Sequence, residues 1–163
     1  MGMYCTLRRV SMEKIAAYLN SSQLLEDDFY SNELTEVPQL DIDKAWDGIH
    51  FLLTGNSISK HEHPLSAVIT GMLDIDENQD FGYGPARYID SQAVKSLNEK
   101  IKFIDLEMLL LSFNPHKMAE LNVYPEIWED AHAFEYLREY FVKLQSFYQH
   151  AAWANEGIVI IIN

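Results

Sequence analysis

The chain has 163 residues, of which 48% are hydrophobic, so it has the size of one domain and enough apolar material for a core. It carries 25 acidic and 12 basic residues and a formal net charge of −13. This balance excludes nucleic-acid backbones and anionic membrane surfaces as partners, because both are bound through clusters of lysine and arginine. It suits a basic protein partner, and solubility alone is the simpler explanation of it.

Cysteine content and the opening residues predict a cytoplasmic protein. Cys5 is the sole cysteine, so no intrachain disulfide can form, as is typical of a reducing compartment. The opening MGMYCTLRRV lacks the long apolar stretch of a signal peptide, and no later run is long enough to cross a bilayer. We therefore expect no membrane segment.

The first forty residues predict a strand followed by a helix. β-favouring residues over 3–10 indicate the strand, and Ser11 is a suitable N-cap for a helix over 12–20. Residues 21–39 are less regular, and a short helix and a surface excursion are the two alternatives there.

The next stretch, LDIDKAWDGIHFLLTG over 40–55, predicts an amphipathic helix. Asp41 is its expected N-cap and Gly55 its expected stop. Asp43, Asp47 and His50 follow one another at helical spacing along the border of its apolar stripe.

The middle of the chain predicts a connector, a strand and a helix. Residues 74–84 are acidic and contain glycine, as solvated connectors do. A strand carrying Arg87 is expected over 86–89, and a helix over 92–100 follows it.

The last sixty residues predict two apolar helices and a buried strand. Residues 104–113, IDLEMLLLSF, are apolar almost all round and indicate a buried helix, with a buried strand as the alternative. The longest helix is expected over 124–155, and the closing run over 158–162 indicates a strand covered on both faces, beside 3–10. The predicted fold is α/β: a helix-flanked, three-layer sandwich with a small, largely buried mixed sheet and a long C-terminal helix.

Several of these segments together resemble the YfbM-like family of bacterial proteins of unknown function. The segments are MGM, LDIDKAWDGIHFLLTG, HPLS, YPEIW and the closing helix, glycine and apolar strand. The resemblance runs over nearly the whole chain and implies one YfbM-like domain over 1–163, with a helix-flanked α/β sandwich. It implies no activity, so catalytic residues stay unknown.

The candidate site combines residues of the 40–55 helix with the strand near 87. A carboxylate one turn before a histidine can orient the imidazole and raise its pKa, which Asp47 would do for His50. Arg87 can grip a carboxylate or phosphate with two donors, or pair with an acid of the chain. The full candidate set is Asp43, Trp46, Asp47, His50, Tyr83 and Arg87.

Neither a metal nor a cofactor is predicted. His61 and His63 stand two residues apart, which lacks the four-residue spacing of a zinc-binding helix. The glycines of FGYGP over 81–85 are too few and wrongly spaced for a phosphate-binding loop or a dinucleotide fingerprint.

Two functions of different classes fit these observations. The first is an interaction protein that offers an acidic, aromatic-bearing surface to another protein, as an inhibitor or immunity protein does to a basic target. Aromatic residues of the long C-terminal helix also suggest a homo-oligomer. Under this reading, capture of a partner should weaken when four acids are neutralised, Asp74, Asp76, Glu77 and Asp80.

The alternative is a small-molecule-binding or enzymatic pocket. It would be centred on Asp47, His50 and Arg87, with Trp46 and Tyr83 as walls. This reading requires the five side chains to converge on one cavity.

Overall fold

The computed structural model describes residues 2–31 and 37–163. In these residues five strands form one sheet in the order β2-β1-β5-β4-β3. The strands are β1 (Cys5–Val10), β2 (Gln39–Asp41), β3 (Leu73–Asp74), β4 (Arg87–Ile89) and β5 (Gly157–Ile162).

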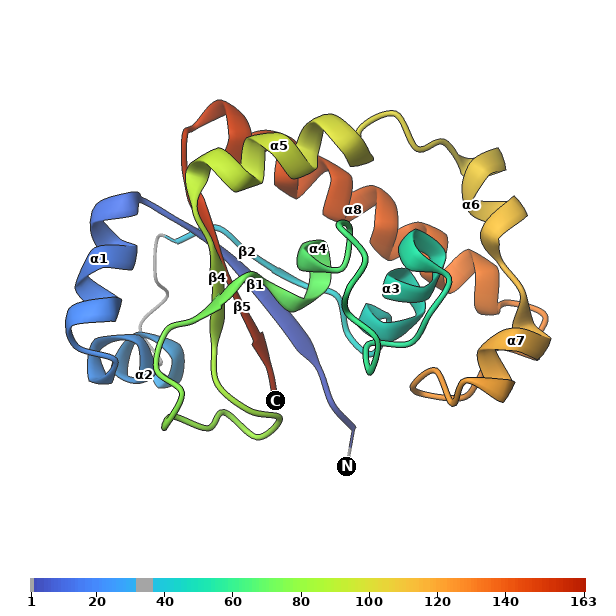
Figure 1. Ribbon diagram of the computed structural model, residues 1–163, viewed down its shortest axis with the longest axis horizontal. Coiled ribbons are helices and arrows are strands. Elements are labelled where there is room, and N and C mark those ends of the chain that lie inside the picture. The colour runs from blue at the N-terminus through green and yellow to red at the C-terminus, as the bar shows by residue number, and fades with distance from the viewer. Residues whose placement is uncertain (1, 32–36) are drawn as a thin grey trace.

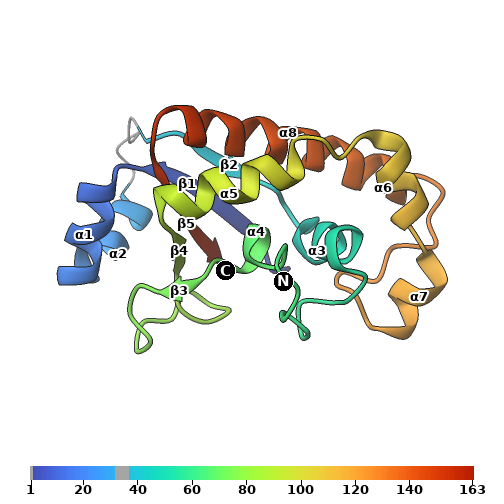
Figure 2. The ribbon, with the colours of Figure 1, turned by 45° about the horizontal axis from the view of Figure 1, so that its top comes forward.

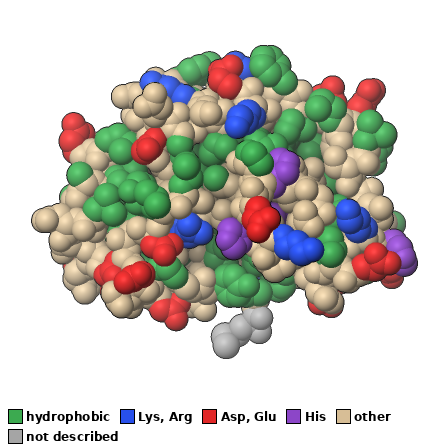
Figure 3. Space-filling view, viewed as in Figure 1, with side chains coloured by type: hydrophobic (Ala, Val, Ile, Leu, Met, Phe, Trp, Pro, Cys, Tyr) green, Lys and Arg blue, Asp and Glu red, His purple; other side chains and the backbone are tan. Residues whose placement is uncertain are grey.

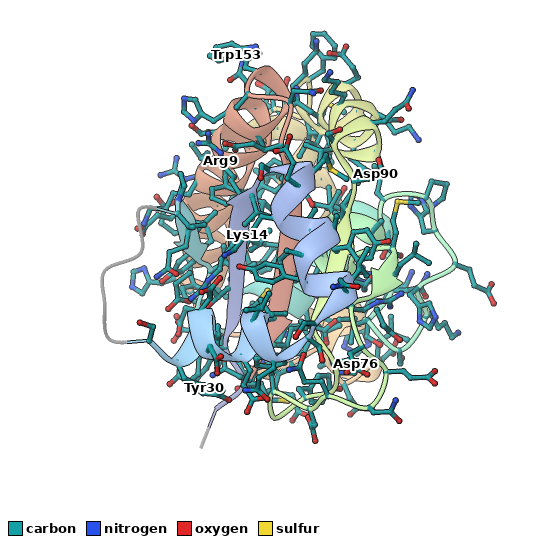
Figure 4. The ribbon with its side chains drawn as sticks, turned by 90° about the vertical axis from the view of Figure 1, so that its left-hand side faces the viewer. Arg9, Lys14, Tyr30, Asp76, Asp90 and Trp153 are labelled. Carbon is teal, nitrogen blue, oxygen red and sulfur yellow. The ribbon has the colours of Figure 1, made fainter. Side chains whose placement is uncertain are left out.

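Helices lie on both faces of this sheet. Helices α1 and α2 cover one face, as the side view shows most directly (Figure 4), and α3, α4, α5 and α8 lie on the other (Figures 1 and 2). The helices are α1 (Met12–Asn20), α2 (Gln23–Tyr30), α3 (Trp46–Thr54), α4 (Ala67–Thr70), α5 (Ser91–Ile101), α6 (Leu106–Ser112), α7 (Pro115–Glu120) and α8 (Ala133–Trp153).

Strand β5 is the centre of the sheet, as its continuous β-branched run predicts. It pairs with β1 from Cys5 opposite Ile162 to Val10 opposite Gly157, and with β4 on its other side. Side chains alternate between the two faces. Ile158 and Ile160 join the larger apolar cluster with α5 and α8, and Val159 joins the smaller one with α1 and α2.

The expectation of a mixed sheet is wrong, because every strand pairing in the described residues is antiparallel. A continuous apolar run reports that a strand is covered on both faces. Antiparallel strands covered by helices on both sides share that property, so the run does not reveal strand direction.

The 40–55 stretch begins as a strand and turns before its helix starts. Its first residues belong to β2, and α3 begins only at Trp46. The Asp41 carboxylate accepts the amide of Asp43 at 2.7 Å and so shapes this turn, in which Asp43 has a left-handed φ of 50°. Gly55 ends α3 with a φ of 75°, as expected of a C-terminal glycine.

Two helices predicted in the second half differ from the structure. Helix α6 is exposed, and Leu109 is its buried residue. The long helix α8 starts at Ala133, since the preceding stretch of 121–132 forms a looped segment with turns. Part of the irregular 21–39 stretch forms α2, and residues 32–36 lie outside the described residues.

Candidate functional sites

Asp47 of α3 joins two loops that are remote in sequence. Its side chain is buried, and its Oδ1 and Oδ2 accept the amides of Ile58 at 2.6 Å and Tyr124 at 2.9 Å. Burial raises the pKa of Asp47, and the two amide hydrogen bonds oppose this shift. Both oxygens are used by the backbone, so this carboxylate holds the fold together.

His50 is fully buried one turn further along α3. Its Nδ1 lies 2.9 Å from the carbonyl oxygen of Asn56, which can only accept, so Nδ1 carries the proton. Its Nε2 lies 2.9 Å from the hydroxyl oxygen of Ser66 and accepts from it in the neutral imidazole. Burial lowers the pKa of His50, the opposite of the shift that a carboxylate partner would cause.

We expect the protein to become less stable as the pH is lowered, because of His50. Since burial lowers the pKa of His50 from its ordinary value of 6.5, the unfolded chain binds a proton at this side chain more readily than the native protein does. The stabilisation is complete above pH 6.5 and is lost as the pH drops, by up to about 1.4 kcal/mol per pH unit. Urea unfolding between about pH 7.5 and about pH 5 measures this slope.

The variant His50→Gln should show a shallower slope over the same range. His116→Gln is the matched control, because His116 is exposed at the surface of α7. Its slope should equal that of the wild type, and equal slopes in all three proteins would show that His50 is not the titrating group.

Trp46 and Asp43 also have partners within the fold. The Trp46 indole donates to the carbonyl of Met3 at 3.0 Å, and its ring stacks on Tyr124 with centroids 5.3 Å apart. Asp43 accepts the hydroxyl of Tyr136 at 2.7 Å. These contacts tie α3 and the turn before it to the start of the chain and to α8.

Tyr83 and Arg87 line a cavity of about 160 Å³ beside β5. The guanidinium of Arg87 donates from Nη2 to the carbonyl of Met72 at 2.9 Å, and its buried Nε lies 3.0 Å from Asp74 in an ion pair without making a hydrogen bond. The cavity, called here the β5 cavity, is lined by Ile58, His61, Ile69, Thr70, Tyr83, Pro85, Arg87, Ile160 and Ile162.

The structure therefore divides the predicted site residues into two groups. Tyr83 and Arg87 share the β5 cavity, whereas Asp47 and His50 do not belong to its lining. Trp46 lies next to Tyr83, with the two ring centroids 5.8 Å apart. Sequence reasoning placed His61 in a loop and missed that this loop folds against β4 and β5.

A second, larger hollow of about 700 Å³ lies between α7 and the start of α8. Its described lining contains three carboxylates, Glu126, Glu129 and Asp130, and no lysine or arginine. Ala119, Ile127, Trp128 and Ala133 give it apolar walls. We call it the acidic cleft. The sequence feature that could have predicted this cleft is PEIWED over 125–130. It was not recognised because the stretch was assigned to a helix.

Acids of the 74–80 loop are used mostly within the fold. Asp76 accepts the hydroxyl of Ser22 at 2.6 Å and an amide of its own turn, and these bonds lower its pKa. Asp80 accepts the amides of Gly82 and Gly84, which lower its pKa in the same way. The carboxylates expected to form an interaction surface therefore shape this loop.

No group of three His, Cys, Asp or Glu side chains in the described part of the chain is arranged to hold a metal ion. Within residues 2–31 and 37–163, no helix has the length and apolar character needed to cross a membrane.

Comparison with known proteins identifies the family. A family model described as a domain of unknown function, DUF1877, matches residues 1–161. The chain belongs to the DUF1877 family. YfbM from Escherichia coli strain K12 is 28% identical over 130 residues, which cover 78% of this chain and 75% of YfbM. The resemblance to YfbM-like proteins is thereby confirmed.

The DUF1877 fold is also seen in a solved structure. The crystal structure of YfbM from Escherichia coli, described as a protein of unknown function, superimposes with a TM-score of 0.78 at 23% identity. The match covers 98% of this chain and 99% of that one, so the two share a fold. The family description names no activity, and the function of this DUF1877 protein has to be inferred from its own surface.

Proposed function

We propose that this chain is a cytoplasmic protein-interaction module that binds a basic partner through the acidic cleft. The observation that carries the proposal is the composition of the cleft: three carboxylates and no lysine or arginine around apolar walls, with His132 and Tyr136 completing the lining. Among the described residues, neither Glu126 nor Glu129 has a lysine or arginine partner. A partner segment with an apolar side chain flanked by lysine or arginine is complementary to it.

Helix α6 supports the proposal with an apolar surface at the same end of the molecule as α7 (Figures 1 and 2). Phe103, just before this helix, is 73% exposed, and Leu111 is 87% exposed. Leu106, Met108 and Leu110 are exposed as well. Neighbouring exposed apolar side chains are typical of protein contact sites.

The aromatic residues of α8 give less support to a homo-oligomer. Phe147 and Tyr148 are buried in the core. Trp153 is 73% exposed and projects from the end of the helix (Figure 4). With most aromatic area used internally, we favour a different protein as the partner. The helices on both sheet faces are compatible with the proposed three-layer arrangement.

Replacing Glu126 and Glu129 together by glutamine should weaken binding of the basic partner about tenfold. Each exposed ion pair contributes up to about 1 kcal/mol, and 1.4 kcal/mol corresponds to a factor of about ten. The immobilised chain is used to retain a partner from bacterial lysate. The partner is then purified, and its dissociation constants from wild type and variant are measured at low and at physiological salt.

A double variant at Glu13 and Glu62, both changed to glutamine, is the matched control. It removes the same charge at exposed positions outside the acidic cleft. It should bind the partner like the wild type. Equal losses in both variants would indicate a general charge effect, and unchanged binding by the cleft variant would also contradict the proposal.

A further inference from the structure

We infer that the β5 cavity binds a small organic carboxylate with a short aliphatic body. This site is separate from the acidic cleft, and the two share no lining residue. The inference combines four features of the cavity: its apolar walls, its size, its lack of acids and the anchored guanidinium of Arg87.

The walls of the cavity are aliphatic. Ile160 and Ile162 of β5, Ile69 of α4 and Ile58 of the preceding loop all contribute to its lining. A volume of 160 Å³ equals the liquid volume of about five water molecules. Drug-sized ligands and nucleotides need pockets of at least about 300 Å³, so the cavity suits a much smaller molecule.

The polar groups of the cavity favour an anion. In a chain of net charge −13, its described lining contains Arg87 and His61 but no aspartate or glutamate. Figure 3 shows lysine, arginine and histidine side chains near the middle of the face drawn there, with an acidic side chain among them. Because no carboxylate lines this cavity, a bound anion would not be repelled by a like charge of the lining.

Arg87 is held ready to bind a carboxylate. Asp74 faces its Nε and the Met72 carbonyl accepts from Nη2, while Nη1 makes no hydrogen bond with the described residues. A guanidinium carries five N–H donors, so donors remain for a ligand. Because the Met72 hydrogen bond and the Asp74 ion pair already restrain the side chain, less of its entropy is lost when it binds a carboxylate with two parallel hydrogen bonds.

The hydroxyl groups beside Arg87 differ in what they can offer the same ligand. Tyr83 is 50% exposed, and its hydroxyl makes no hydrogen bond within the described residues, so it is free to donate to a carboxylate oxygen. The Thr70 hydroxyl lies 3.1 Å from the carbonyls of Ser66 and Gly71 and donates to the backbone. Its proton is therefore used within the fold, and Tyr83 is the hydroxyl that can donate to the carboxylate.

The test is NMR titration of protein labelled at isoleucine δ1 methyl groups, with 3-methylbutanoate as the probe. We expect saturable shifts of the lining methyls, Ile58, Ile69, Ile160 and Ile162, and none at the distant Ile15. A probe of about seven non-hydrogen atoms should bind with a dissociation constant on the order of 1 mM. The uncharged amide of the same acid should bind about tenfold more weakly or worse.

Two variants distinguish the loss of the guanidinium from the loss of its ion pair. Arg87→Gln should weaken binding of 3-methylbutanoate about tenfold or more, whereas Asp74→Asn breaks the same ion pair, keeps the guanidinium and should still bind. Unperturbed shifts of Ile15 show that each variant is folded. If Arg87→Gln does not fold, Tyr83→Phe, which removes the free hydroxyl alone, should weaken binding measurably.

Three results would overturn the inference: no shift of the lining methyls, equal binding of acid and amide, or equal binding by wild type and Arg87→Gln. An acetylated Gly-Gly-Leu peptide adds a second source of the same carboxylate. Tighter binding of this peptide than of 3-methylbutanoate would assign the cavity to a chain terminus, and weaker binding would assign it to a free acid.

Discussion

Replacing Asp47 by alanine should lower the free energy of unfolding by about 3 to 5 kcal/mol. The change removes the acceptor of two backbone amides, those of Ile58 and Tyr124, which are bound at 2.6 and 2.9 Å in a buried place. A hydrogen bond to a charged group contributes about 1.5 to 3 kcal/mol, and a buried donor left without a partner costs about as much. Urea unfolding followed by circular dichroism measures the loss.

Asp47→Asn is the informative control, because it keeps the side-chain volume and one acceptor oxygen. One of the two amides stays bound, so we expect roughly half the loss caused by alanine. Glu77→Gln, at an exposed position, should change the free energy of unfolding by at most about 0.5 kcal/mol. A loss below about 1 kcal/mol for Asp47→Ala would show that the two loops are held by other contacts.

Where local pattern determines an element, the sequence was sufficient. Helix α1 runs over the predicted 12–20, and the Ser11 hydroxyl accepts the amide of Lys14 at 3.1 Å as its cap. The apolar run of β5 lies in the middle of the sheet beside β1. For α1 the deciding contact joins residues that are close in sequence. For β5 the apolar run directly reflects burial on both faces.

Other elements depend on what lies opposite them, and there the sequence misled. The run of leucines in α6 is apolar enough for a core, yet most of it faces away from the larger apolar cluster. Apolar composition alone cannot tell a core helix from a docking helix. Residues 124–132 of the looped segment were likewise assigned to the long helix, because Trp128 and Ala131 extend the spacing of threes and fours of its apolar residues.

The candidate site shows the same difference between what a local pattern predicts and what distant contacts determine. Spacing placed Asp47 and His50 on one helix, but each finds its partners in loops, at Tyr124 for Asp47 and at Ser66 for His50. These contacts span 77 and 16 positions of the chain, and no periodic pattern encodes them. Arg87 was selected for its chemistry, and its position in the β5 cavity follows from the sheet order.

Trp128 connects the acidic cleft to the core, and replacing it by alanine should cost about 3 to 5 kcal/mol of the free energy of unfolding. Its ring is almost fully buried and lies where a side chain on Gly48 of α3 would be. Its indole N–H donates to the carbonyl of Val123 at 2.6 Å and closes the looped segment. Chemical denaturation measures the loss, which is a large share of the 5 to 15 kcal/mol typical of a domain.

Trp128→Phe separates the packing of the ring from its hydrogen bond. Phenylalanine fills most of the volume and removes one of two donors to the Val123 carbonyl, which keeps the amide of Glu126 at 3.0 Å, so we expect a loss of about 0.5 to 1.5 kcal/mol. Because the hydrogen bond closes the segment that carries Glu126 and Glu129, this variant should also bind the basic partner more weakly while its core stays folded. Wild-type affinity in a folded Trp128→Phe protein would mean that the cleft keeps its shape without this bond.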